Sequence, residues 1–180
     1  NSGVLEQLKT KKFKTRFSIF DWHPSIEKQE AFTRIMKVTD IKPGDVAAWL
    51  YTEKVIHTLP GHILFIDSPP VKLEKPRKPL VDGLDQYEVT IIDTSQEAKS
   101  RDDTRFVSDA ALRDENEAKG KQRGSVASPN YKGVGRGHIR FYADSAGDNK
   151  GITFSFDRAK FHGLDDWNIL VGRPKIKTPN

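Results

Sequence analysis

The sequence predicts an α+β domain in which N-terminal helices pack on a mostly antiparallel sheet. Apolar residues recur at helical spacing near the N-terminus, and runs rich in Val, Ile, Phe and Tyr follow between Gly, Pro and Asp turns. The chain has 180 residues, of which 36% are hydrophobic and 31% charged. This length and composition predict one globular domain over residues 1–180.

The first helix is expected at Val4, Leu5 and Leu8, with Asn1 or Ser2 as its cap. A second helix is expected to follow, and the chain then changes to the period of strands. The second helix opens at Pro24 and Ser25, contains Ile26, Phe32, Ile35 and Met36, and ends in the turn at 40–44. The expected strands cover 46–51, 63–66, 87–92, 138–142, 152–156 and 169–171.

Polar residues at two neighbouring strand ends form a candidate site. His62 opens one expected strand and Asp93 follows the end of the next. In antiparallel neighbours the start of one strand lies near the end of the other, and alternation places His62 on the face of Leu64 and Ile66. A carboxylate there could fix the tautomer of the imidazole. The plainer interpretation is a strand-end histidine and an ordinary strand terminator.

Three short motifs resemble those of the NlpC-type papain-like amidases and peptidases. Residues 42–49 (KPGDVAAW) are similar to the family's "pGDlv.f" strand, and residues 61–67 (GHILFID) to its "GHv.i" strand. Residues 1–5 (NSGVL) resemble the nucleophile motif "DCSGfv" from its cysteine onward, with Asn1 where cysteine belongs. The resemblance implies a papain-like fold and cleavage of amide or ester bonds in peptide or cell-wall-type substrates, with His62 as base and Asp93 as its partner.

Asn1 conflicts with that chemistry, because an amide cannot replace a thiolate nucleophile. Three explanations stay open: a natural pseudoenzyme, a cysteine replaced on purpose, or a truncated chain. A shift of register that makes Ser2 the nucleophile is a further alternative. The sequence therefore predicts no hydrolytic turnover by this polypeptide, and restored activity in an Asn1→Cys variant.

The long polar segment at 96–130 is expected to be an insertion that forms a rim or lid next to His62. Arg101 and Arg105 are then candidate contacts for an acidic ligand group. The alternative is a solvated insertion that faces away. The segment at 68–86 carries four prolines and is expected to be a surface loop.

Trp49, Tyr51 and Trp167 are candidate contacts for a sugar or peptide, although aromatic residues on strands more often belong to a core. The histidine spacing does not fit a zinc site, so neither a metal nor a cofactor is expected. No apolar run is long enough for a membrane span.

Two other classes of function stay open. A non-catalytic module could use the same site to bind a peptide or glycan. A net charge of +5 and three basic clusters in expected loops would suit a polyanion, although no nucleic-acid-binding motif accompanies them. The sequence indicates neither the oligomeric state nor the compartment, and the resemblance is compatible with export to a bacterial periplasm or surface.

Overall fold

The computed structural model describes residues 18–51, 60–95, 98–100, 102–105, 133–157 and 160–176. The first expected helix and most of the polar insertion lie outside these ranges. The elements are α2 (Ile19–Glu27), β1 (Phe32–Ile35), η1 (Val38–Asp40), β2 (Val46–Leu50), β3 (Gly61–Ile66), β4 (Val71–Lys72), β5 (Asp85–Ser95), β6 (Gly133–Ala143), β7 (Asn149–Thr153), β8 (Phe161–Gly163), α4 (Leu164–Trp167) and β9 (Leu170–Pro174).

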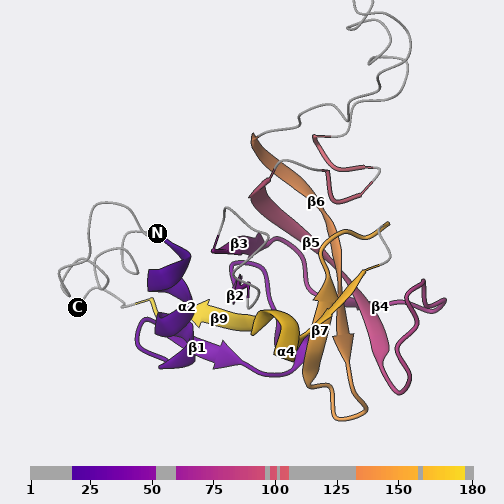
Figure 1. The fold of residues 1–180 in the computed structure, drawn as a ribbon, viewed down its shortest axis with the longest axis horizontal. Helices are drawn as coiled ribbons and strands as arrows, with labels where there is room; N and C mark the ends of the chain where they lie inside the picture. Colours follow the sequence, from indigo (N-terminus) through magenta and orange to yellow (C-terminus); the bar gives the residue numbers. More distant parts are fainter. Residues whose placement is uncertain are drawn as a thin grey trace, which may run out of the picture.

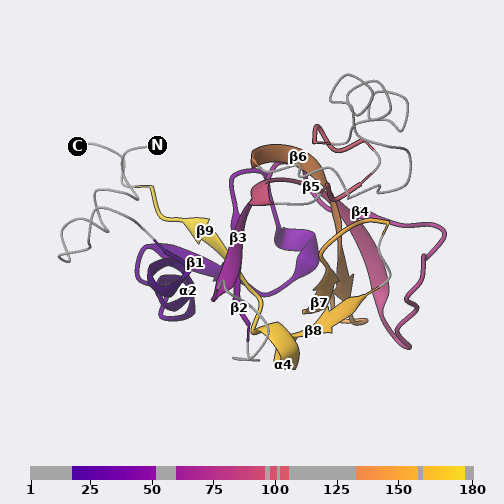
Figure 2. The same ribbon diagram turned by 45° about the horizontal axis from the view of Figure 1, so that its top comes forward.

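All nine described strands belong to one antiparallel sheet (Figure 1). The strand order is β1-β9-β2-β3-β5-β6-β7-β8, with β4 beside β5. The last strand in sequence therefore inserts between the first two. Figure 2 shows that the sheet curls, so that its strands lie around a shared interior. The long strands β5 and β6 pair along their full lengths and form the spine of this curl.

The predicted α+β class is wrong, because the described helices are short and the sheet dominates. The interior is filled mainly from the sheet itself, so it does not need a layer of N-terminal helices to cover it. Of the described helices, α2 packs against β1, β2, β3 and β9 on the outer side of one part of the sheet (Figure 1).

The second predicted helix is also misplaced. The observed α2 begins earlier, at Ile19, where the Ser18 backbone N–H donates to the Asp21 carboxylate at 2.8 Å. It ends at Glu27, and Gln29 then takes a left-handed conformation with φ of 52°. Residues 32–35 pair with β9 instead of continuing the helix. This long-range pairing outweighs the weak helical spacing of the apolar residues there.

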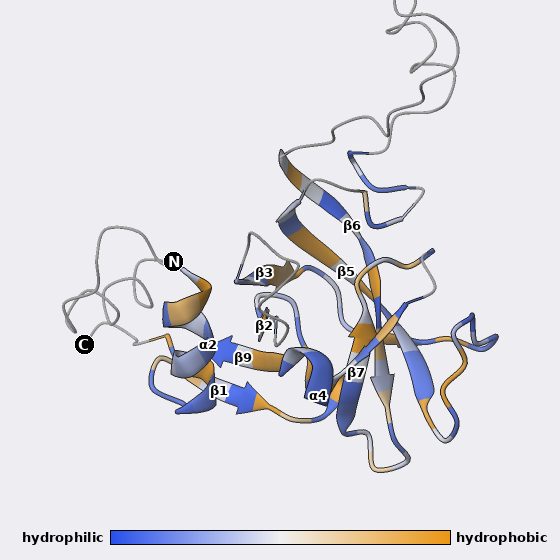
Figure 3. Ribbon diagram, viewed as in Figure 1, coloured by the Kyte–Doolittle hydropathy of each residue, from blue (hydrophilic) through white to orange (hydrophobic). Residues whose placement is uncertain are grey.

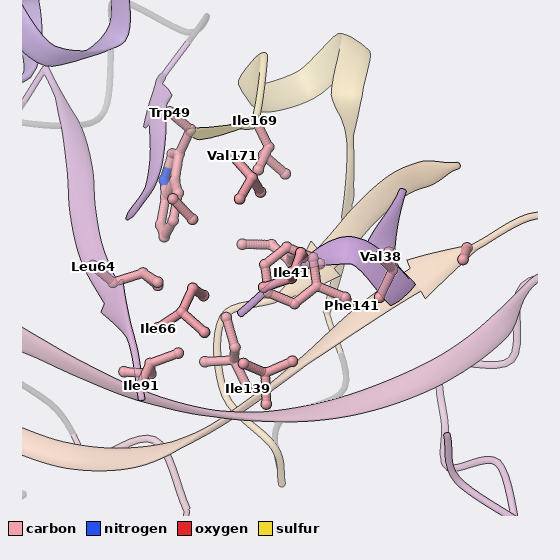
Figure 4. Close-up of a cluster of buried hydrophobic side chains, with 14 residues drawn as sticks. Val38, Ile41, Trp49, Leu64, Ile66, Ile91, Ile139, Phe141, Ile169 and Val171 are labelled. Atoms are coloured by element: carbon pink, nitrogen blue, oxygen red, sulfur yellow. The ribbon is translucent and has the colours of Figure 1, made fainter. Parts of the chain in front are cut away.

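Two apolar clusters lie on opposite faces of the sheet. The inner cluster fills the curl and includes Trp49, Leu64, Ile91 and Ile139, with Ile41 entering from the segment after η1 (Figure 4). The outer cluster lies between α2 and the sheet. Its buried members are Ile19, Ile26, Ala31, Phe32, Val46, Ala48 and Leu170. Strand β2 alternates between the two clusters, so it is buried on both faces.

Hydrophobic and hydrophilic residues alternate along strands of the sheet (Figure 3). Alternate residues of β3 divide between the clusters: Leu64 and Ile66 face inward, whereas Ile63 packs against the outer cluster. The alternation predicted from the sequence for this strand is therefore confirmed. Within the described residues, no helix has the length and apolar character needed to cross a membrane.

The turn before β2 (KPGD) is held by a buried carboxylate. Gly44 has a positive φ of 90°, which glycine adopts without strain. Asp45 is 1% exposed and accepts hydrogen bonds from the Lys42 backbone at 2.8 Å and from the Arg173 guanidinium at 2.8 and 2.9 Å. The aspartate of this motif thus ties the turn to β9 and has a structural role.

Candidate functional site

The structure brings His62 and Asp93 together on the inner face of the sheet. His62 Nε2 lies 2.8 Å from Asp93 Oδ2. Leu64 is the residue directly opposite Asp93 in the β3–β5 ladder, so His62 lies two positions further along the same face. The His62 side chain is 12% exposed and the Asp93 side chain is fully buried.

Asp93 also contacts two cations from the segment after β5. Arg105 NH1 lies 2.7 Å from Asp93 Oδ1 and forms an ion pair with it. Lys99 Nζ lies 3.9 Å from Oδ2, and its side chain is 2% exposed. The two carboxylate oxygens thus face different partners: Oδ1 faces Arg105, and Oδ2 faces His62 with Lys99 further away.

A second carboxylate holds Arg105 in place. Asp103 Oδ1 accepts from Arg105 Nε at 2.9 Å, and Asp103 Oδ2 accepts from Arg105 NH2 at 2.8 Å. Asp103 also accepts from the backbone N–H groups of Lys99 and Arg105, at 2.7 and 2.8 Å. Burial raises the pKa of Asp103, but these hydrogen bonds more than offset it and leave that pKa below its usual value.

Two glycines of β6 make room for this cluster. Gly135 pairs with Asp93 and Gly137 pairs with Ile91 in the β5–β6 ladder. A Cβ at Gly135 would collide with the Arg105 side chain, and a Cβ at Gly137 would collide with Asp103. The glycine-rich run at 133–137 is thus part of a regular strand that leaves space for charged side chains.

The described residues 98–100 and 102–105 lie beside β6. The Thr104 N–H donates to the Arg136 carbonyl at 2.9 Å, and the His138 N–H donates to Ser100 Oγ at 3.2 Å. The Lys99 carbonyl accepts from the Phe156 N–H at 2.7 Å. These contacts hold the described residues of the predicted insertion beside β6, and Lys99 and Arg105 contact Asp93 from there.

Aromatic rings support His62 from the core side. Its ring centroid lies 5.2 Å from that of Trp49 and 4.7 Å from that of Phe154. Trp49 stacks on Trp167 with a centroid distance of 5.4 Å. Lys99 Nζ lies 3.2 Å from the Phe154 ring centroid, so Phe154 contacts both the imidazole and a buried ammonium group.

The other predicted site residues fall in different places. Trp49 is fully buried, so it supports the His62 ring and does not present a surface to a substrate. Tyr51 is half-buried against Trp167, and burial raises the pKa of its hydroxyl. Arg105 has a side-chain exposure of 5%, and its guanidinium faces carboxylates of the chain instead of a ligand. The remaining predicted site residues, Asn1, Ser2 and Arg101, lie outside the described residues.

Sequence reasoning missed the residues that surround Asp93. Lys99 and Asp103 lie in a polar segment that carries no strand pattern, and Phe154 follows β7. A signal was nevertheless present in β6. Glycine at positions 133, 135 and 137 removes every side chain from one face of a strand over five residues, which indicates that another group packs there.

A second histidine cluster lies on the outer face of β6. His138 Nδ1 lies 2.9 Å from Glu88 Oε1, and His138 Nε2 lies 3.0 Å from Asp102 Oδ2. The two carboxylates approach opposite edges of the ring, so they do not converge on one point. The described ranges contain no group of three or more His, Asp or Glu side chains placed to hold a metal ion.

Comparisons with known proteins give little further information. No protein-family model matches the chain, and no solved structure matches it. The chain is similar to the "Uncharacterized protein R653" of Acanthamoeba polyphaga mimivirus, with 26% identity over 164 residues. The match covers 87% of this chain and 63% of that protein. The chain thus spans less than two thirds of the length of this relative.

Proposed function

We propose that His62 and Asp93 are the base and the orienting carboxylate of a hydrolase site that cleaves amide or ester bonds. The observation that carries the proposal is the 2.8 Å contact between a partly exposed imidazole and a fully buried carboxylate. In nucleophile–base triads a buried carboxylate holds the imidazole in one tautomer and orientation. The peptide or cell-wall class of substrate rests on the motif resemblance.

The hydrogen-bond chemistry assigns the two ring nitrogens of His62. A carboxylate only accepts, so Nε2 carries the hydrogen that Asp93 Oδ2 receives. The neutral ring then has its lone pair on Nδ1. Within the part of the chain that the structure describes, no side chain hydrogen-bonds to Nδ1. This nitrogen is therefore the one able to take a proton from a nucleophile.

The nucleophile position is Asn1 by the motif resemblance, and an amide cannot form an acyl-enzyme. The chain as it stands is expected to bind substrate without turnover. An Asn1→Cys variant tests the placement directly, because the chain has no cysteine and the new thiol is unique. Ser2→Cys provides a matched control with a thiol one residue away.

The measurement is the rate of alkylation by iodoacetamide at pH 6 in the full chain. A free thiol with a pKa of about 8.5 is less than about 1% thiolate at this pH, whereas a thiol paired with an imidazole is mostly ionised. Since nucleophilicity falls as thiol pKa falls, the net gain over Ser2→Cys should be about tenfold. His62→Ala should remove this gain. Equal rates for the two cysteine variants, or a gain that survives His62→Ala, would overturn the proposal.

A second candidate is a non-catalytic module that binds a peptide or glycan at the same site. The presence of Asn1 favours it, because an asparagine can hydrogen-bond a ligand but cannot attack it. An activated ester such as p-nitrophenyl acetate separates the two candidates. A burst of nitrophenol from Asn1→Cys supports the hydrolase site. If the thiol of Asn1→Cys is alkylated faster than that of Ser2→Cys but gives no burst, the binding module is favoured.

The third candidate, a polyanion binder, has less structural support. The described basic cluster at residues 72–78 is partly neutralised by the chain itself. Lys72 pairs with Asp85 at 2.7 Å, and Arg77 pairs with Asp157 at 3.1 Å. Binding to nucleic acid that weakens steeply with salt would revive this candidate.

A further inference from the structure

Arg105 has the environment of a residue that positions another group. Its guanidinium contacts Asp93 at 2.7 Å and Asp103 at 2.8 and 2.9 Å, and all three side chains are 5% exposed or less. An arginine fork that spans two carboxylates is fixed in its plane and direction, unlike an exposed side chain that samples many rotamers. Its position is therefore set by the fold.

Strand β6, beside Arg105, has glycines where the charged side chains lie. Asp93 lies opposite Gly135 across the β5–β6 ladder, so strand β6 itself places no side chain next to the Asp93 carboxylate. Arg105 fills that space, and any Cβ at Gly135 would collide with it. The neighbouring Gly137 leaves the corresponding space for Asp103. Gly135 and Gly137 of β6 thus lack side chains at the place where Arg105 and Asp103 pair.

The contacts divide the two oxygens of Asp93. Arg105 NH1 faces Oδ1 and His62 Nε2 faces Oδ2. A carboxylate on a freely rotating side chain could present either oxygen at a range of angles. With Oδ1 fixed by the guanidinium, the carboxylate plane is set and Oδ2 points at the imidazole.

We infer that Arg105 is a positioning residue that, together with Asp103, orients the Asp93 carboxylate so that His62 keeps its hydrogen on Nε2 and its lone pair on Nδ1. This inference rests on the proposed function for its chemical meaning. Its physical content, the dependence of the His62–Asp93 hydrogen bond on Arg105, holds with or without a nucleophile. Within the described residues, the Arg105 guanidinium contacts the two carboxylates and makes no ion pair or hydrogen bond with the imidazole.

The test measures the rate at which the His62 Nε2 hydrogen exchanges with water. Nitrogen-edited NMR of the full chain monitors this rate at a pH where the ring is neutral. Arg105→Met should speed this exchange about tenfold, the size expected when a charge-assisted hydrogen bond loses its fixed acceptor. Arg105→Lys keeps the charge but not the fork, so it should give an intermediate rate. Lys99→Met is the matched control. It removes a buried cation 3.9 Å from the same carboxylate and should leave the exchange rate nearly unchanged.

Unchanged exchange in folded Arg105→Met would overturn the inference, and so would an equal acceleration in Lys99→Met, which would indicate a general effect of charge. If Arg105→Met does not fold, Arg105→Lys provides the test. Exchange at the parent rate in Arg105→Lys would show that the guanidinium fork is not needed and would overturn the inference. Circular dichroism establishes folding in each case.

Alkylation in the Asn1→Cys background separates this inference from the proposed function. If the thiol is activated by His62 but is equally reactive with Arg105→Met, the positioning role fails and the hydrolase site stands. If the thiol is not activated, while Nε2 exchange still depends on Arg105, the hydrolase proposal fails and the positioning role stands.

Discussion

Asp93 and Gly135 lie directly opposite each other in the β5–β6 ladder, and the Arg105 side chain fills the space that a side chain at Gly135 would occupy. This relationship links β5, the segment that carries Arg105, and β6. It buries an ion pair next to the imidazole of His62.

Asp93→Asn should lower the free energy of unfolding by about 3 kcal/mol, because it leaves the buried Arg105 with one carboxylate instead of two. Urea denaturation measures the change. Asp67→Asn is the control, since Asp67 pairs with Arg136 at 2.6 Å near the surface. Exposed pairs contribute little, so this variant should unfold at nearly the parent urea concentration. Similar losses in both variants would contradict the importance of burial.

Gly135→Ala should destabilise the protein by about 1–3 kcal/mol, because its Cβ would displace the Arg105 side chain from Asp93. Val134→Ala, on the neighbouring position of the same strand, is the comparison. Val134 is 73% exposed, so its truncation should change stability by less than about 0.5 kcal/mol. Thermal unfolding of both variants decides the point. A neutral Gly135→Ala would mean that the charged cluster can move aside without loss.

Arg173→Ala should cost about 1–3 kcal/mol, since it leaves the buried Asp45 carboxylate without its guanidinium partner. Lys72→Ala breaks an ion pair of similar length, 2.7 Å to Asp85, whose side chains are 57% and 45% exposed. No measurable loss is expected there. Chemical denaturation of the two variants should therefore give clearly different midpoints.

Asp103→Asn should make the protein less sensitive to acid. The pKa of Asp103 in the folded protein lies below its usual value, so its ionised form favours folding above the unfolded pKa of about 3.9. This contribution is lost as the pH falls further, through the folded pKa. The parent should thus lose more stability than Asp103→Asn between neutral pH and about pH 2. Parallel losses in the two proteins would show that other carboxylates account for acid unfolding.

The sequence by itself determined the local features of the fold. Alternating apolar residues located most of the strands, and the same alternation placed His62 with Leu64 and Ile66 on the inner face. This succeeds because side-chain direction in a strand depends only on neighbouring residues. Strand β8 was missed, since its three residues, Phe161–Gly163, are too few to show a period.

Only the tertiary structure decided the class of fold and the surroundings of Asp93. Residues 32–35 form a strand because β9, more than 130 positions later in the chain, lies beside them. Arg105 reaches Asp93 because Gly135 on β6 leaves it space, and a polar segment gives no local sign of such a partner. Strand pairing and buried ion pairs join distant residues, so their energies depend on contacts that no short stretch of sequence contains.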